Sequence, residues 1–83
     1  MKEKTRQSID DYAKNRIPVG SFLRSVLCNN LFGAIGRADP DNLKDLNEIC
    51  RYIFDEIPSN SWGSSKVYDA WIAPRLKGEL DAK

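Results

Sequence analysis

The chain has 83 residues, of which 41% are apolar and 30% are charged, so it is expected to form a small globular domain rather than a disordered segment. Thirteen Lys and Arg face twelve Asp and Glu, and the net charge of +1 lacks the basic excess of a general nucleic-acid binder. The absence of histidine excludes the usual zinc finger and the side chain most often used in acid–base catalysis.

Apolar residues recur at helical spacing through most of the chain, and no stretch alternates with the period of a strand, which predicts an all-α fold. The first helix is predicted over residues 5–16, with Thr5 or Ser8 as its cap. The second helix runs from Pro18, which suits a first helical turn, to Gly36, a candidate C-cap glycine. Its wide apolar stripe makes it the expected central helix.

The third helix has the clearest boundaries in the sequence. Asp39 is a natural N-cap, and Pro40 follows it in the first-turn position. Apolar residues then alternate spacings of three and four along one seam. Pro58 is predicted to stop the helix, because a proline disfavours helical backbone in the residue before it, here Ile57.

A short fourth helix is predicted over residues 65–73, with Ser64 as its cap and Pro74 as its stop. The simplest architecture is a small three-helix core with this fourth C-terminal helix folded across it. We expect residues 1–83 to form a single helical domain with an ordered core of about 5–77 and charged ends that fray.

Neither the cysteines nor the hydropathy pattern indicates a secreted or membrane protein. Cys28 and Cys50 lie within apolar patterns and form no CxxC pair, and we interpret both as buried, reduced thiols rather than as a disulfide. No signal-peptide pattern follows the basic start, and no stretch approaches the roughly 20 apolar residues of a membrane span. The expected location is the cytoplasm.

No arrangement of residues in the sequence indicates an enzyme. Without histidine no Ser/His or Cys/His pair can form, and no glycine-rich phosphate loop is present. Asp41, Asp45 and Glu48 share spacings of four and three, so they line one helix face. They could hold a divalent metal, but a solvated helix surface is the favoured interpretation. We predict no catalytic residue, no metal and no cofactor.

The charges are unevenly distributed along the chain. Residues 12–38 contain no acid but include Arg24 and Arg37, whereas residues 39–56 contain six acids. Either adjacent helices complement each other within the fold, or one patch meets a charged partner.

Two predicted helix starts combine glycine and serine, at Gly20-Ser21 and at Gly63-Ser64. Backbone N–H groups at a helix N-terminus readily bind phosphate or carboxylate. Ordinary capping explains both pairs equally well, so an anion site is one of two open interpretations.

Most aromatic residues, including Phe32 and Phe54, fit the helix stripes and are predicted to be core. Trp62 differs because it lies in a loop, where it either plugs the core or anchors a partner. Tyr52 lies off the main seam of the third helix and could stack on a ligand or pack on a second subunit.

The run IPVGSFLRSVLCNNL at residues 17–31 is followed by GRADPDN at 36–42 and WGS at 62–64. This pattern resembles a group of short bacteriophage and prophage proteins of uncharacterised function, and the similarity covers most of residues 9–72. The resemblance implies a phage context. It carries over neither a mechanism nor a functional residue.

The favoured hypothesis is a non-catalytic, phage-type interaction protein that binds and modulates or inhibits a protein of the host bacterium, for example a defence component, in the host cytoplasm. Its partner-binding residues are predicted to be Arg24, Arg37, Trp62 and Tyr52. An alternative is an oligomer that sequesters a small nucleotide-like anion at helix N-termini and Arg side chains. The candidate helix N-terminal positions are Gly20, Ser21, Gly63 and Ser64, and Arg24, Arg37 and Trp62 are further candidates for contact with the anion. A DNA-binding regulator ranks third, because the third helix would be the reader and is acidic. No residue excludes a structural role in a virion.

Overall fold

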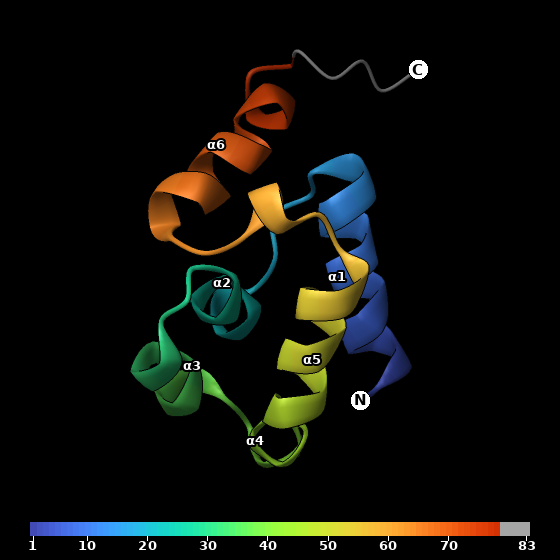
Figure 1. Ribbon diagram of the computed structural model, residues 1–83, viewed down its shortest axis with the longest axis vertical. Helices are drawn as coiled ribbons and strands as arrows, with labels where there is room; N and C mark the ends of the chain where they lie inside the picture. The colour runs from blue at the N-terminus through green and yellow to red at the C-terminus, as the bar shows by residue number, and fades with distance from the viewer. Residues whose placement is uncertain (79–83) are drawn as a thin grey trace.

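A computed structural model describes residues 1–78 and shows a bundle of short helices (Figure 1). The elements in chain order are α1 (Glu3–Asn15), α2 (Ser21–Leu27), α3 (Leu31–Arg37), α4 (Pro40–Lys44), α5 (Leu46–Glu56), the 3-10 turn η1 (Ser59–Ser61) and α6 (Ser65–Leu76). These described residues contain no strand, which confirms the predicted all-α fold. Residues 79–83, where fraying was predicted, lie outside the described part of the chain.

The core lies where α1, α2, α5 and α6 face one another, with α6 and α4 at opposite ends of the molecule (Figure 1). Apolar side chains from each of these four helices interlock, since the helical periodicity places them on inward faces. α3 adds only one side chain. The buried apolar residues are Ile9, Tyr12, Phe22, Leu23, Leu27, Ala34, Ile49, Ile53, Ile57, Tyr68 and Ile72.

Tyr12 joins α1 to η1 and α6. It is fully buried, and its hydroxyl donates a hydrogen bond to the carbonyl of Ser61 at 2.6 Å. Its ring stacks on Tyr68 with centroids 5.3 Å apart, and its carbonyl accepts a 2.8 Å hydrogen bond from the Trp71 indole. A buried phenol usually has a hydrogen-bond partner. Through these contacts, Tyr12 connects α1 with η1 and α6, which are distant from it in the sequence.

The predicted second helix is interrupted around Asn29, between the end of α2 at Leu27 and the start of α3 at Leu31. Asn29 has a φ of +62°, a left-handed conformation that asparagine tolerates better than most residues. The side chain of Asn30 then accepts a hydrogen bond from the Gly33 N–H at 2.9 Å and caps α3. The apolar periodicity of the sequence continues through this break, so the pattern predicted one continuous helix.

The predicted third helix begins as expected, with Asp39 accepting from the Asn42 N–H at 2.7 Å and Pro40 in the first turn. It is divided, however, into α4 and α5 at Asp45. α5 ends at Glu56, and Ile57 is extended before Pro58, as predicted.

The boundaries of the other predicted helices need correction. α1 begins at Glu3 and has no side-chain cap, so neither Thr5 nor Ser8 caps it. Pro18 precedes α2 rather than opening it, since Gly20 is the N-cap. Gly36 lies within α3 rather than after it.

Ser64 caps α6 as predicted, accepting from the Val67 N–H at 3.1 Å, but Pro74 does not end this helix. α6 continues to Leu76, and the Arg75 guanidinium donates to the Asn15 carbonyl at 2.6 Å. This contact holds the last turn against α1.

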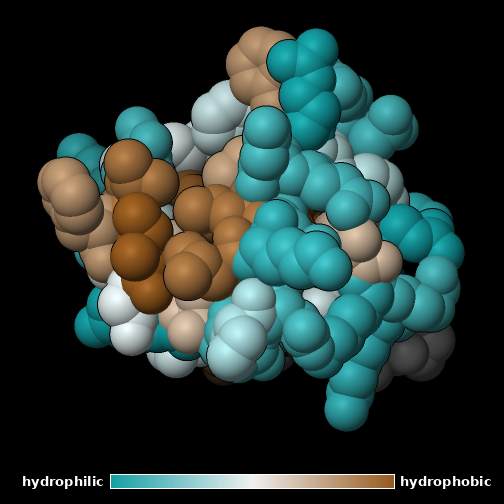
Figure 2. All heavy atoms as spheres, turned by 90° about the horizontal axis from the view of Figure 1, so that it is seen from below, coloured by the Kyte–Doolittle hydropathy of each residue, from teal (hydrophilic) through white to brown (hydrophobic). Residues whose placement is uncertain are grey.

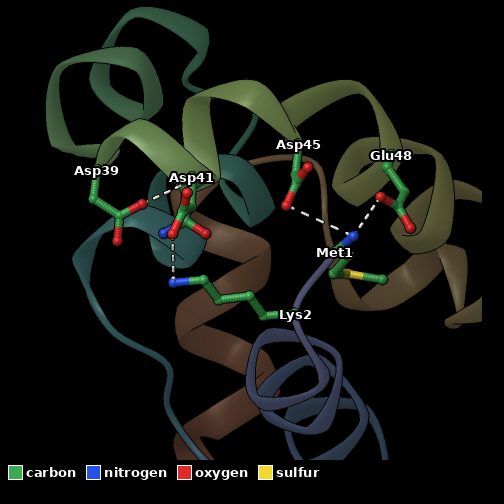
Figure 3. A network of polar contacts seen from close by, with 7 residues as sticks. Met1, Lys2, Asp39, Asp41, Asp45 and Glu48 are labelled. Carbon is green, nitrogen blue, oxygen red and sulfur yellow. Dashed lines mark hydrogen bonds and ion pairs between the residues drawn. The ribbon is translucent and has the colours of Figure 1, made fainter.

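The N-terminal end, predicted to fray, is held by the acidic side chains of α4 and α5 (Figure 3). The Met1 ammonium lies 3.6 Å from the Asp45 carboxylate and contacts Glu48, and Lys2 pairs with Asp41 at 2.9 Å. The acids predicted to form a solvated face are therefore partly engaged within the fold.

Candidate functional site

Large apolar side chains are exposed on α3 and α4. Figure 2 shows apolar side chains gathered on the side of the lower face where Figure 1 places α3. Phe32 is 83% exposed, so the prediction that it is a core residue is wrong. The reason is the break at Asn29, which turns α3 away from the direction of α2. The exposed apolar residues of α3 and α4 are Leu31, Phe32, Ile35 and Leu43.

Next to α3, a groove runs along α2 and α5 to the loop that carries Trp62. It consists of two adjoining hollows of about 340 and 70 Å³ that share Val26, Asn29 and Cys50. We define the apolar groove by its apolar lining: Val26, Leu31, Ala34, Leu46, Cys50, Ile53, Phe54 and Trp62. Its polar lining residues are Asn29, Asn30, Asn47 and Arg51, and we call Asn47 and Arg51 on α5 its polar rim.

Trp62 both packs on the core and lines the groove. Its ring is half-buried and lies 5.9 Å from the ring of Phe54, which is exposed. Its indole Nε1 is buried and has no hydrogen-bond partner among residues 1–78. The two interpretations of Trp62, a plug of the core and an exposed anchor, thus describe two faces of one side chain.

Both cysteines are free thiols, but the prediction that both are buried is wrong. Cys28 is half-buried and Cys50 is exposed in the groove, because α5 turns this side of its surface away from the core. Partial desolvation raises the pKa of each thiol above its ordinary value, so less of the nucleophilic thiolate is present at neutral pH.

Arg24 and Arg37, predicted together from charge alone, line one cavity of about 480 Å³ between α2, α3 and the start of α6. We call this cavity the basic pocket. Its polar lining residues are Ser21, Arg24, Ser25, Asn30, Arg37 and Ser65. Sequence reasoning missed Ser25, and it did not place Asn30 or Ser65 beside the two arginines, because only the chain reversal at Asn29 brings α2 and α3 together.

Each arginine of the basic pocket is only partly engaged by the fold. Arg24 lies 3.8 Å from the Asp69 carboxylate and 5.4 Å from the ring centroid of Tyr68. Arg37 donates one hydrogen bond, from Nη1 to the Gly33 carbonyl at 3.2 Å. A guanidinium has five N–H donors, so both arginines retain donors for a ligand.

The other candidate anion-binding positions are used differently. The Gly63 N–H donates to the Leu27 carbonyl at 2.8 Å, and the Ser64 hydroxyl caps α6. These contacts favour ordinary capping at this helix start. Gly20 is the N-cap of α2 and does not line the basic pocket, whereas Ser21 does.

Tyr52 lies in the interface between α5 and α1, away from both the groove and the basic pocket. Its hydroxyl donates a hydrogen bond to the Asp10 carboxylate, which raises the pKa of the Tyr52 phenol. The hydrogen bond to α1 explains why a tyrosine lies beside the main apolar seam of α5.

The acidic face of α4 and α5 offers no cluster for a metal. Among residues 1–78, no group of three or more His, Cys, Asp or Glu side chains could hold a metal ion. Asp41, Asp45 and Glu48 instead contact Met1 and Lys2.

No protein-family model, curated protein or solved structure matches the chain. Within residues 1–78, none of the helices is both long and apolar enough to cross a membrane. The candidate sites therefore stand on their geometry alone.

Proposed function

We propose that this protein acts by binding another protein, without catalysis, and that the apolar groove receives an apolar segment of its partner. The observation that carries the proposal is the concentration of exposed apolar side chains on α3 and α4, beside a groove rimmed by Phe54 and Trp62. A monomer rarely exposes such a contiguous surface unless it binds something.

The composition of the groove fits a protein interface. Phe54 and Trp62 provide two aromatic rings, and Arg51 lies at the rim with its guanidinium 5.9 Å from the Phe54 centroid. Tryptophan and arginine are enriched at binding hot spots. A polar rim around an apolar centre is the usual anatomy of an interface.

The shape of the groove favours a helical partner segment. Its two hollows lie in a row between α2–α3 and α5. An amphipathic helix places apolar residues at spacings of three and four, so consecutive anchors can enter consecutive hollows. The partner's polar face would then meet Asn47 and Arg51 at the rim.

The resemblance to short phage proteins adds the context of this proposal. On that resemblance, the partner is a host protein that the chain meets in the bacterial cytoplasm and modulates or inhibits. The lack of histidine and the raised pKa values of both thiols support a role in binding rather than in catalysis.

Site-specific photo-crosslinking in bacterial cells tests the proposal. A photoreactive phenylalanine analogue replaces Phe54 in the groove or, as a control, Leu76 on α6. These side chains are matched in exposure, at 64% and 66%. We expect a discrete adduct from position 54 alone, and its loss when Val26→Asp places a charge in the groove.

Three outcomes would contradict the proposal. They are the same adducts from both positions, no adduct from position 54, and an adduct of twice the mass of the chain. The last would indicate self-association and would favour the oligomeric alternative.

A further inference from the structure

We propose that the basic pocket is a second binding site, which takes the phosphate monoester group of a small ligand and shares only Asn30 with the lining of the apolar groove. Arg24 projects from α2 and Arg37 from α3, so two cationic side chains from different helices line one cavity. None of the side chains that line it within residues 1–78 is a carboxylate. The cavity is therefore a concave surface with an excess of positive charge.

Ser25 adds a hydroxyl to the lining of the basic pocket. The residue is only 7% exposed, and it lines the pocket. A serine hydroxyl carries one O–H donor, which an acceptor oxygen in the cavity would engage.

Asn30 adds another donor. Its Oδ1 accepts from the Gly33 N–H, which leaves the two N–H groups of Nδ2 available. The Asn30 amide and the Arg37 guanidinium both lie close to Gly33, since a Cβ placed there would meet both of them. A side chain at position 33 would therefore displace the donors, and glycine leaves room for them.

The start of α6 adds a favourable field. Ser65, the first residue of this 12-residue helix, lines the cavity. The positive end of a helix favours an anion in this position. Asp69, one turn further along, is the opposing charge, since it pairs with Arg24 at 3.8 Å.

The number and origin of the donors favour phosphate over carboxylate. Donors come from α2, α3 and α6, hence from several sides of the cavity. A phosphate monoester presents three charged or accepting oxygens in a tetrahedral array, whereas a carboxylate presents two in one plane. A volume of about 480 Å³ also leaves room for an organic group beyond the phosphate, since ligand pockets of this size hold small molecules.

Nuclear magnetic resonance titration of the full chain tests this site with inorganic phosphate and with adenosine monophosphate, at neutral pH and constant ionic strength. We expect saturable shifts of the Ser25, Asn30, Arg37 and Ser65 amide signals. Tighter binding of the nucleotide would identify an organic phosphate as the source of the group, and equal binding would identify free phosphate.

Variants of the pocket make the test specific. Arg24→Gln and Arg37→Gln should each weaken binding about tenfold or more, because each removes a charge-assisted hydrogen bond. Ser25→Ala should weaken it several-fold. Asp69→Asn should strengthen phosphate binding, since it removes the carboxylate that competes with the ligand for Arg24.

Arg6→Gln is the matched control, because Arg6 is exposed, pairs with Glu3 and lines neither the basic pocket nor the apolar groove. It should leave the affinity unchanged. The proposal is overturned if phosphate causes no saturable shift, if the shifted amides lie elsewhere, or if Arg6→Gln weakens binding as much as Arg37→Gln does.

Discussion

The end of the molecule around Tyr12 and the end formed by α3 and α4 are built in opposite ways. Around Tyr12, the side chains of α1, η1 and α6 are buried and joined by hydrogen bonds between segments about 50 or more residues apart. On α3 and α4, most of the large apolar side chains face solvent, and α3 contributes only Ala34 to the buried core.

The contrast separates the part of the chain that forms the buried core from the part that leaves its large apolar side chains exposed. A small domain buries a modest share of its surface, so each large apolar side chain kept outside the core lowers the stability it can reach. Phe32 and Leu31 are kept outside while Tyr12 is enclosed on every side. This cost supports the proposal that the exposed surface is an interface.

The largest difference is expected when a large side chain is truncated to alanine at each of the two ends. Tyr12→Ala removes a fully buried ring and should lower the free energy of unfolding by about 3–5 kcal/mol. Phe32→Ala, at an exposed position, should change it by no more than about 0.5 kcal/mol. Urea denaturation followed by circular dichroism measures both values. Similar losses for the two variants would mean that the ends are not distinct.

A smaller effect concerns the Tyr12 hydroxyl alone. Tyr12→Phe leaves the Ser61 carbonyl without its donor and should cost about 1–2 kcal/mol. Burial raises the pKa of the Tyr12 phenol, so the folded state keeps a proton that the unfolded state loses above pH 10.0. The stability held by this group is thus present below pH 10.0 and falls as the pH rises above it.

Denaturation curves at neutral pH and at alkaline pH check the sign of this prediction. The wild-type protein should lose stability more steeply than Tyr12→Phe as the pH rises. Parallel losses in the two proteins would show that the phenol keeps an ordinary pKa.

A local effect is expected at the break between α2 and α3. Asn30→Ala removes the cap of α3 and should cost about 1 kcal/mol in this helix. Hydrogen exchange of the α3 amides should quicken by a factor of about five, while the amides of α1 and α6 stay unchanged. Equal acceleration throughout the chain would show that the two ends open together.

The smallest expected effect lies at the N-terminus. The hydrogen bond to Glu48 raises the pKa of the Met1 ammonium above 8.0. Its contribution to stability is present below pH 8.0 and is lost as the pH rises through the raised value. Thermal melts across this range should show a larger decline for the wild-type protein than for Glu48→Gln, and identical declines would exclude the contact.

Much of the fold could be predicted from periodicity and caps. Asp39, Ser64 and Pro58 mark helix ends in the sequence, and all three do so in the structure. The break at Asn29 was missed because apolar spacing records which faces are apolar but not whether the backbone stays helical between them. The adjacent asparagines, one tolerant of positive φ and one able to cap, were the available signal.

The candidate sites were less accessible from the sequence. Charge patterning selected Arg24 and Arg37, which share the basic pocket. The groove could not be found in the same way, because its lining is drawn from α2, α3, α5 and the Trp62 loop. Apolar spacing assigned Phe32 and Phe54 to the core, and only the directions of the short helices show that they are exposed.

The native thiol of Cys50 offers the most direct measurement of whether a partner occupies the groove. Alkylation of Cys50 should be slowed about tenfold or more in cells compared with the purified protein, since a bound segment would cover this exposed thiol. As a control, a cysteine that replaces Leu76 in a Cys50→Ser background should be alkylated at the same rate in cells and in the purified protein. Equal reactivity of Cys50 in cells and after purification would contradict the proposal that the groove is a protein-binding surface.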